Sequence, residues 1–186
     1  MEEGQSPSNK GGLLMKCITI SGKAGHGKDT FAKNLKKDLE AQGLRVFIFH
    51  YADYIKMLAK EIYGWNGEKD EKGRSILQNL GDKLRSKNKR IIIDELIKIL
   101  KLVEDDFDIA IIPDARLPLE IEVLKEIWHT VSIHINRINY VNILTSEQKK
   151  HLTETALDNY KYDLSYDIEE GDFRSHYLDV MKLLRD

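Results

Sequence analysis

Apolar and polar positions along the chain follow two alternating patterns, which predict strands that take turns with helices. Four short, nearly continuous apolar runs are typical of buried strands: residues 15–20, 44–51, 107–114 and 130–137. Between them, apolar residues recur every three or four positions, as over residues 31–39, which indicates helices with one buried face. Strands that alternate with helices favour a parallel sheet covered on both faces. We therefore expect an α/β fold with three layers around a parallel sheet of about five strands.

The remaining pattern predicts further helices and one short strand. Helices are expected near residues 55–62, 76–80, 91–100, 119–127, 146–159 and 173–184, and a strand at 164–168. Asp172 would cap the last helix. Residues 53–90 are polar, rich in lysine and without a predicted strand, so we interpret them as an insertion. Residues 1–13 have little to bury and are expected to be a disordered tail before one domain at 14–186.

A glycine-rich turn follows the first predicted strand and precedes the first predicted helix. Gly22, Gly27 and Lys28 fit the pattern G-x-x-x-x-G-K of a phosphate-binding loop. Glycines permit positive φ angles and close backbone approach, so that successive N–H groups point at phosphate oxygens, and the helix adds its positive end. The expected nucleotide-binding residues are Gly22, Ala24, Gly25, His26, Gly27, Lys28, Asp29 and Thr30.

The position after the loop lysine departs from the common pattern. Asp29 stands where a serine or threonine usually contacts Mg²⁺, and Thr30 follows it. The preceding strand and the following helix supply the context that the pattern requires, so we prefer a nucleotide phosphate site to a structural glycine turn.

Charged residues are expected where the other strands end. In an open parallel sheet ligands bind outside the carboxyl ends of the strands, where Asp53, Asp114, Arg116 and Arg137 should converge with the loop. Asp114 is a candidate ligand of Mg²⁺, and Arg116 could grip a phosphate through its two-pronged guanidinium. The alternative for Asp114 is a turn residue after a proline.

Several further residues have a plain structural alternative. Asp53 and Lys56 could face the phosphate loop, or they could be a helix N-cap and a solvated lysine. Arginines 74, 85 and 137 could neutralise a transferred phosphoryl group, although surface arginines are usually only solvated. The set His151, Glu154 and Asp158 would share one helix face, and we favour a surface network over zinc there. Trp65 is interpreted as a core anchor rather than a platform for base stacking.

Composition narrows the class of protein. A net charge of −2 and a pI near 6.3 provide no basic field for nucleic acid, so a small phosphate-bearing substrate fits better. The single cysteine, Cys17, lies in the first predicted strand and is expected to be a packed thiol. No apolar run approaches the length of a membrane span, so we expect a cytoplasmic protein, a monomer or homodimer, without a membrane partner.

With these pieces placed, the chain resembles the phage-type deoxynucleoside monophosphate kinases, a branch of the P-loop nucleoside monophosphate kinases. The resemblance extends over nearly the whole chain. It rests on residues 22–30 with their Gly-Lys-Asp-Thr ending, on Tyr51-Ala52-Asp53 with Lys56, on Tyr63-Gly64-Trp65 with Arg74 and residues 77–81, on Asp114-Ala115-Arg116, and on residues 151–158.

The resemblance implies ATP- and Mg²⁺-dependent phosphoryl transfer to a nucleoside monophosphate. It implies an acceptor-binding insertion at 53–90 and a lid at 138–158 over the phosphates. Lys28, Asp114, Arg116 and Arg137 would be catalytic, and Asp29 and Asp114 would hold the metal. The substrate-binding set would be Asp53, Lys56, Arg74, Arg85, Arg116 and Glu154.

Three alternatives stay open at this point. Dephospho-coenzyme A kinase and phosphomevalonate kinase have a similar layout and take other acceptors. A non-enzymatic ATP or GTP switch would leave the cations between Asp53 and Arg85 without a ligand. A kinase acting on nucleic acid is disfavoured by the charge.

Overall fold

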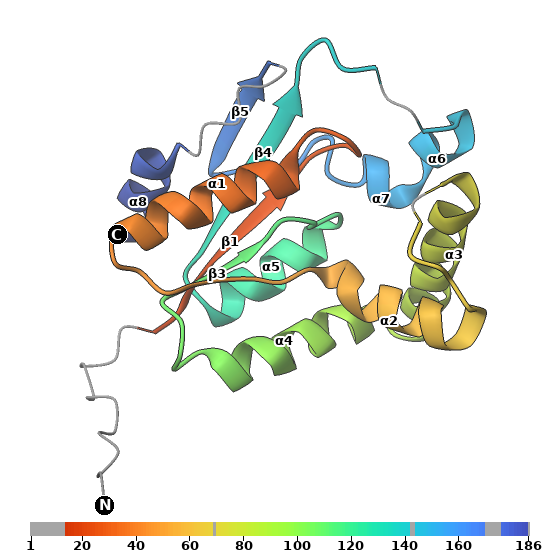
Figure 1. The fold of residues 1–186 in the computed structure, drawn as a ribbon, viewed down its shortest axis with the longest axis horizontal. Helices are drawn as coiled ribbons and strands as arrows, with labels where there is room; N and C mark the ends of the chain where they lie inside the picture. Colours follow the sequence, from red (N-terminus) through yellow and green to blue (C-terminus); the bar gives the residue numbers. More distant parts are fainter. Residues whose placement is uncertain (1–13, 69, 142–143, 170–175, 186) are drawn as a thin grey trace, which may run out of the picture.

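A five-stranded sheet forms the centre of the computed structural model, which describes residues 14–68, 70–141, 144–169 and 176–185 (Figure 1). Its strands are β1 (Lys16–Ser21), β2 (Val46–Ile48), β3 (Ile109–Ile112), β4 (Thr130–Arg137) and β5 (Leu164–Ile168). They are all parallel and lie in the order β2-β3-β1-β4-β5. The expected α/β fold with about five parallel strands is thus confirmed.

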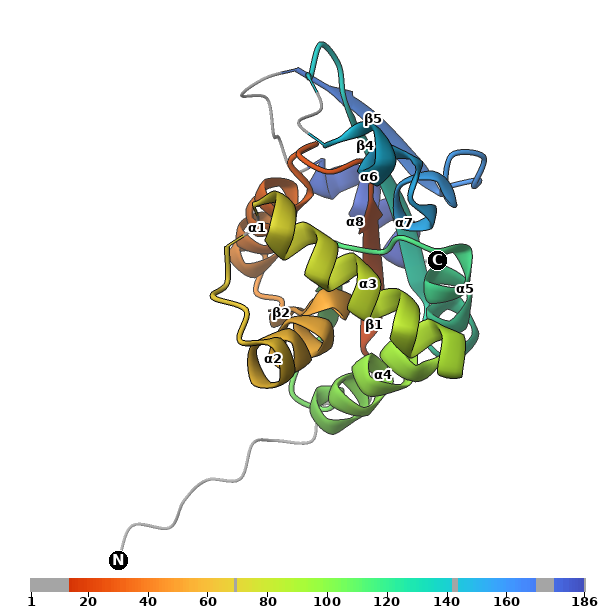
Figure 2. The same ribbon diagram turned by 90° about the vertical axis from the view of Figure 1, so that its right-hand side faces the viewer.

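Helices cover both faces of this sheet and continue beyond its carboxyl edge. They are α1 (Lys28–Ala41), α2 (Tyr51–Tyr63), α3 (Glu71–Lys87), α4 (Ile91–Val103), α5 (Pro118–Ile127), α6 (Ser146–Lys150), α7 (Leu152–Thr155) and α8 (Tyr177–Arg185). One face carries α1 and α8, and the other carries α4 and α5 (Figure 1). Helix α3 runs beside α2 and α4, so the insertion is a helical unit next to the sheet (Figure 2).

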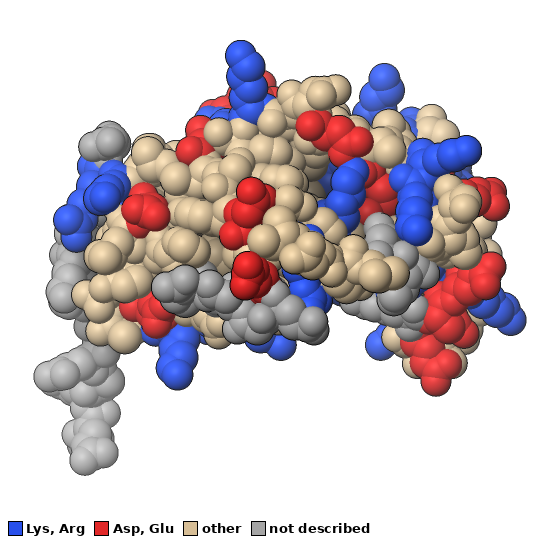
Figure 3. Space-filling view, turned by 90° about the horizontal axis from the view of Figure 1, so that it is seen from above, with Lys and Arg blue, Asp and Glu red and all other residues tan. Residues whose placement is uncertain are grey.

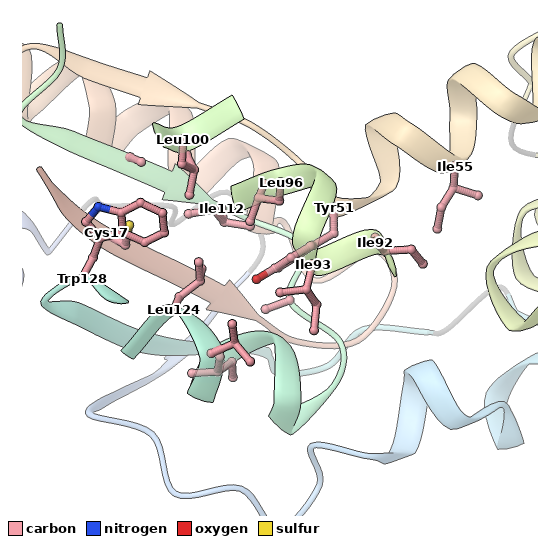
Figure 4. Packing of buried hydrophobic residues seen from close by; sticks show 14 of the residues in the cluster. Cys17, Tyr51, Ile55, Ile92, Ile93, Leu96, Leu100, Ile112, Leu124 and Trp128 are labelled. Atoms are coloured by element: carbon pink, nitrogen blue, oxygen red, sulfur yellow. The ribbon is translucent and has the colours of Figure 1, made fainter. Parts of the chain in front are cut away.

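Two hydrophobic clusters, one on each face, hold the layers together. On the α1 side Phe31 and Leu35 are fully buried against the strands. On the other side Leu96, Leu124 and Trp128 belong to one buried cluster with Cys17 (Figure 4). Burial raises the pKa of the Cys17 thiol to about 12, so it is a packed core residue, as expected.

The second strand is shorter than its apolar run predicts. Asp114 accepts hydrogen bonds from the backbone N–H groups of Tyr51 and Ala52, both at 2.9 Å, and α2 begins at Tyr51. The N-cap of α2 is His50. The placement of Asp53 at a strand end or as an N-cap is therefore wrong, because Asp114, in the turn after β3, binds the first N–H groups of a helix that begins two residues before Asp53.

The helix expected over residues 146–159 is also divided. His151 has an extended backbone, with φ −59° and ψ 144°, and separates α6 from α7. Its ring nitrogen Nδ1 accepts from the N–H of Thr153 at 3.3 Å and so caps α7. His151, Glu154 and Asp158 consequently do not share one helix face. Across the described residues, no group of three or more His, Cys, Asp or Glu side chains could hold a metal ion.

Other expectations have different outcomes. Trp65 is 7% exposed and donates from Nε1 to the carbonyl of Glu68 at 2.8 Å, which confirms a core anchor. The tail at 1–13, the cap Asp172 and the start of the last helix at residue 173 lie outside the described residues. Among the described helices, none is long and apolar enough to cross a membrane.

Candidate functional site

The loop between β1 and α1 has the backbone that a phosphate-binding loop needs. Gly25 and Gly27 have φ angles of 82° and 83°, in the left-handed region that favours glycine. A Cβ atom on Gly22 would lie 2.3 Å from the carbonyl oxygen of Ile135, and one on Gly25 would lie 2.0 Å from the hydroxyl of Tyr140. Close packing against backbone therefore excludes a larger residue at Gly22, and the left-handed backbone disfavours one at Gly25.

Lys28 is folded over this loop. Its side chain is buried, and its ammonium donates to the carbonyls of Gly22 at 2.8 Å and Lys23 at 2.9 Å. Burial, with a smaller contribution from the nearby Arg116, lowers the pKa of Lys28 to about 7. An anion bound to the loop would stabilise the charged form of this buried ammonium.

One cavity of about 330 Å³ opens in front of the loop. The loop, α2, α3 and the turn after β3 all contribute to its wall. The predicted site residues that line it are Ala24, Gly25, Lys28, Asp29, Lys56, Arg74, Arg85, Asp114, Arg116 and Glu154. The structure thus brings together the glycine-rich loop and all four cations of the predicted substrate-binding set: Lys56, Arg74, Arg85 and Arg116.

An imidazole links the first turns of α1 and α2 beside this cavity. His50 Nε2 lies 2.9 Å from Asp29 Oδ1, and His50 Nδ1 lies 3.4 Å from Asp53 Oδ2. The hydrogen bond to Asp29, followed by the one to Asp53, raises the pKa of His50 to about 9. Burial alone would raise the pKa of Asp53, but hydrogen bonds from His50 and Lys56 outweigh it and lower that pKa below its usual range. Asp53 does not line the cavity; it holds His50 and Lys56 in place.

The side chain of Glu154, on α7, contacts the backbone of the phosphate loop. Its buried carboxylate accepts from the N–H of Ala24 at 3.2 Å through one oxygen and from the guanidinium of Arg116 through the other. Lys23 donates to the backbone carbonyl of Glu154 and pairs with Asp158. A carboxylate therefore already occupies one loop N–H and the arginine proposed for the acceptor.

A buried ion pair forms one wall of the cavity between α3 and α5. Glu120 is 1% exposed, and its Oε1 lies 3.3 Å from Arg85 Nη2. The other oxygen accepts from the backbone N–H groups of Arg116 at 2.7 Å and Leu117 at 3.1 Å. Burial raises the pKa of Glu120, and Arg85 and the two N–H groups oppose that rise. Arg85 is thereby held next to the Arg116 turn.

Arg137 does not join this cavity, contrary to the expected convergence. Its guanidinium lies 4.9 Å from the ring centre of Tyr140, and it lines a second cavity of about 530 Å³ with Tyr140 and Glu169. The backbone N–H of Arg137 donates to His26 Nδ1 at 3.1 Å, so His26 supports the loop from behind. The β4 strand extends past the loop, and this carries Arg137 to the other side of it.

Sequence reasoning missed several residues of the site. In the sequence, His50 stands out only as a member of the apolar run at residues 44–51. Glu120 carried a usable signal, because it lies on the helix face of Val123 and Leu124, where a charge needs a buried partner.

On the described part of the face in Figure 3, basic and acidic side chains are interspersed rather than gathered by sign.

Comparison with known proteins gives a partial family match. Residues 15–100 match the family of the chromatin associated protein KTI12. No curated protein matches the chain in sequence.

Similar solved structures cover nearly the whole chain. The Mycobacterium tuberculosis APS kinase CysC in complex with AMPPNP and APS is 13% identical, with a TM-score of 0.50 over 93% of this chain and 99% of that one. A sugar kinase from Janibacter sp. HTCC2649 is 14% identical, with a TM-score of 0.47 over 92% and 95%. With its glycine-rich loop and five parallel strands, the chain shares the fold of this APS kinase.

Proposed function

We propose that the protein is a kinase that transfers the γ-phosphoryl group of ATP to a nucleoside or deoxynucleoside monophosphate and releases the diphosphate. The observation that carries this proposal is the shared cavity. The phosphate loop with Lys28 forms one part of its wall, and a separate set of cations from other elements forms another. A switch that binds only a nucleoside triphosphate would not need that second set.

The donor side is the loop and the first turn of α1. Its backbone N–H groups and Lys28 would hold the β- and γ-phosphates of ATP, with Thr30 near the α-phosphate. Gly22 and Gly25 have positive φ angles of 147° and 82°, which would let the loop backbone turn its N–H groups toward a phosphate. Among the described residues the buried ammonium of Lys28 contacts two backbone carbonyls and no carboxylate, so it fits a phosphate group.

The acceptor side is formed by Lys56, Arg74, Arg85 and Arg116. All four line the cavity, and they come from α2, α3 and the turn after β3. An acceptor phosphate is already an anionic nucleophile, so no general base is required. Its oxygen would form the new bond to the γ-phosphorus while the bond to the ADP oxygen breaks, and catalysis would be positioning with charge neutralisation.

The carboxylates Asp29 and Asp114 fit a magnesium ion that accompanies ATP. Both line the cavity next to the loop, and carboxylate oxygens are ligands that Mg²⁺ prefers. Each oxygen of Asp114 accepts one backbone N–H and retains further acceptor capacity for the metal or its water. Magnesium would neutralise charge on the β- and γ-phosphates during transfer.

A coupled assay tests the proposal. ATP consumption is measured with each nucleoside monophosphate, each deoxy form, dephospho-coenzyme A, phosphomevalonate and a short oligonucleotide. We expect turnover that depends on a monophosphate and is lost by orders of magnitude in Lys28→Ala. The matched control is Lys33→Ala, an exposed lysine on the same helix, which should retain full activity. ATP binding without any acceptor-dependent turnover would refute the proposal, and turnover with another acceptor alone would replace the substrate.

A further inference from the structure

The polar side chains that line the main cavity are nearly all engaged with other parts of the protein. Lys56 pairs with Asp53, Arg85 with Glu120 and Arg116 with Glu154. Gln78 on α3 differs, because its half-buried amide has no hydrogen-bond partner within the described residues. An amide in this setting offers a donor and an acceptor side by side to whatever enters the cavity.

Gln78 lies on α3 between two cations of the cavity, with Arg74 four residues before it and Arg85 seven residues after it. Arg85 and the backbone of Arg116 meet at Glu120, and Arg116 also reaches the phosphate loop through Glu154. This cluster marks where an acceptor phosphate would be held. Gln78 lies on the same face of α3 seven residues before Arg85, about 10 Å along the helix axis at the usual rise per residue.

Apolar side chains line the same cavity as Gln78. Ile55 and Leu144 are buried, Leu77 is half-buried, and all three line the cavity. The cavity thus offers cations, an apolar wall and one unpaired amide. A nucleotide presents groups that match all three: an anionic phosphate, the flat apolar face of a base and a polar base edge.

We propose that Gln78 reads the base of the acceptor nucleotide through paired hydrogen bonds to the base edge. The inference rests on the proposed kinase function and names the residue that would set base specificity within it. Glutamine amides make such paired contacts with base edges, and one good pair discriminates between bases by about 5- to 150-fold, or ~1–3 kcal/mol. Phosphomevalonate has no base edge and would leave the amide without a partner.

The test is the ranking of acceptors in variants of Gln78. In Gln78→Leu, kcat/KM for the preferred monophosphate should fall by about 5- to 150-fold and the ranking among bases should flatten, while KM for ATP stays unchanged. In Gln78→Glu the carboxylate can only accept, so the ranking should move toward guanine, whose N1–H and N2–H groups are adjacent donors. The control is Asn79→Leu, which removes the neighbouring exposed amide and should change neither quantity.

The outcomes separate the inference from the function on which it rests. If wild-type protein phosphorylates a monophosphate and Gln78→Leu keeps the wild-type ranking of bases, the assignment of Gln78 is wrong and the kinase stands. If wild-type protein shows no monophosphate-dependent turnover, both fall together. Melting temperatures of the two Gln78 variants would check that each variant is folded. Either folded variant alone is enough to test whether Gln78 sets the ranking of bases.

Discussion

Replacing the buried Glu120 by alanine should destabilise the protein more than any surface change on the same helix. The Glu120 carboxylate pairs with the guanidinium of Arg85, whose side chain is 16% exposed. It also accepts hydrogen bonds from two backbone N–H groups just before α5. Alanine leaves all of these without a partner. Removing one member of a buried ion pair costs about 3–5 kcal/mol, because the remaining charge stays buried and uncompensated.

Two further variants separate charge from shape. Glu120→Gln keeps the size and one acceptor oxygen, so we expect a loss of about 1.5–3 kcal/mol from the charged hydrogen bonds. Replacing both partners, in Arg85→Met with Glu120→Leu, should recover much of the stability because no charge remains buried. The double variant should nevertheless bind the acceptor poorly, since Arg85 lines the cavity.

Urea unfolding followed by circular dichroism measures these free energies. Glu126→Ala, an exposed glutamate on the same helix, serves as the control and should stay within about 0.5 kcal/mol of the wild type. A Glu120→Ala variant within about 1 kcal/mol of the wild type would refute the reasoning. So would a double variant as unstable as the single one, because the cost would then not come from an unpaired arginine.

The remaining predictions concern protons and the acceptor phosphate. Because the pKa of Lys28 is about 7 in the empty site, ATP binding at about pH 8 should take up close to one proton, and calorimetry in buffers of different ionisation enthalpy should show no uptake in Lys28→Met. The pKa of His50 is raised to about 9, so its stabilising contribution is complete below its ordinary value of about 6.5 and is lost as pH rises through 9. Melting temperatures should therefore fall more steeply over that interval in the wild type than in His50→Gln, and parallel curves would contradict the pairing. Arg116→Lys should lower kcat/KM for the acceptor about ten- to a hundredfold with KM for ATP unchanged, and a defect mainly in ATP affinity would place Arg116 on the donor side.

Local signals in the sequence were enough to predict the sheet, the phosphate loop and most of the cavity lining. Glycine spacing between a strand and a helix depends on neighbours in sequence, so Gly22 to Lys28 could be read directly. Apolar runs marked the strands because parallel strands are buried on both faces. Because ligands bind outside the carboxyl ends of parallel strands, Asp114 and Arg116 could be placed correctly beside the loop.

Contacts between distant residues decided what local signals missed. The end of β2 depends on Asp114, which lies 63 residues further along the chain and accepts the N–H of Tyr51. The break at His151 accompanies a contact of 2.8 Å to Asp82 on α3. Neither partner can be identified from hydrophobic periodicity. The prediction for Arg137 was wrong because it depends on how far β4 extends beyond the end of β1. That distance is set by the register between the two strands, which hydrophobic periodicity does not reveal.

The position of Glu154 has a consequence for how two ligands would influence each other. An anion that takes the N–H of Ala24 competes with the Glu154 carboxylate, and the same carboxylate holds Arg116. Displacing Glu154 for one ligand therefore frees a cation for the other. The α7 segment also contacts α3 through His151 and Asp82, so both walls of the cavity share this link. Such a connection acts equally in both directions, and whatever factor ATP adds to the affinity for the acceptor, the acceptor must add to the affinity for ATP.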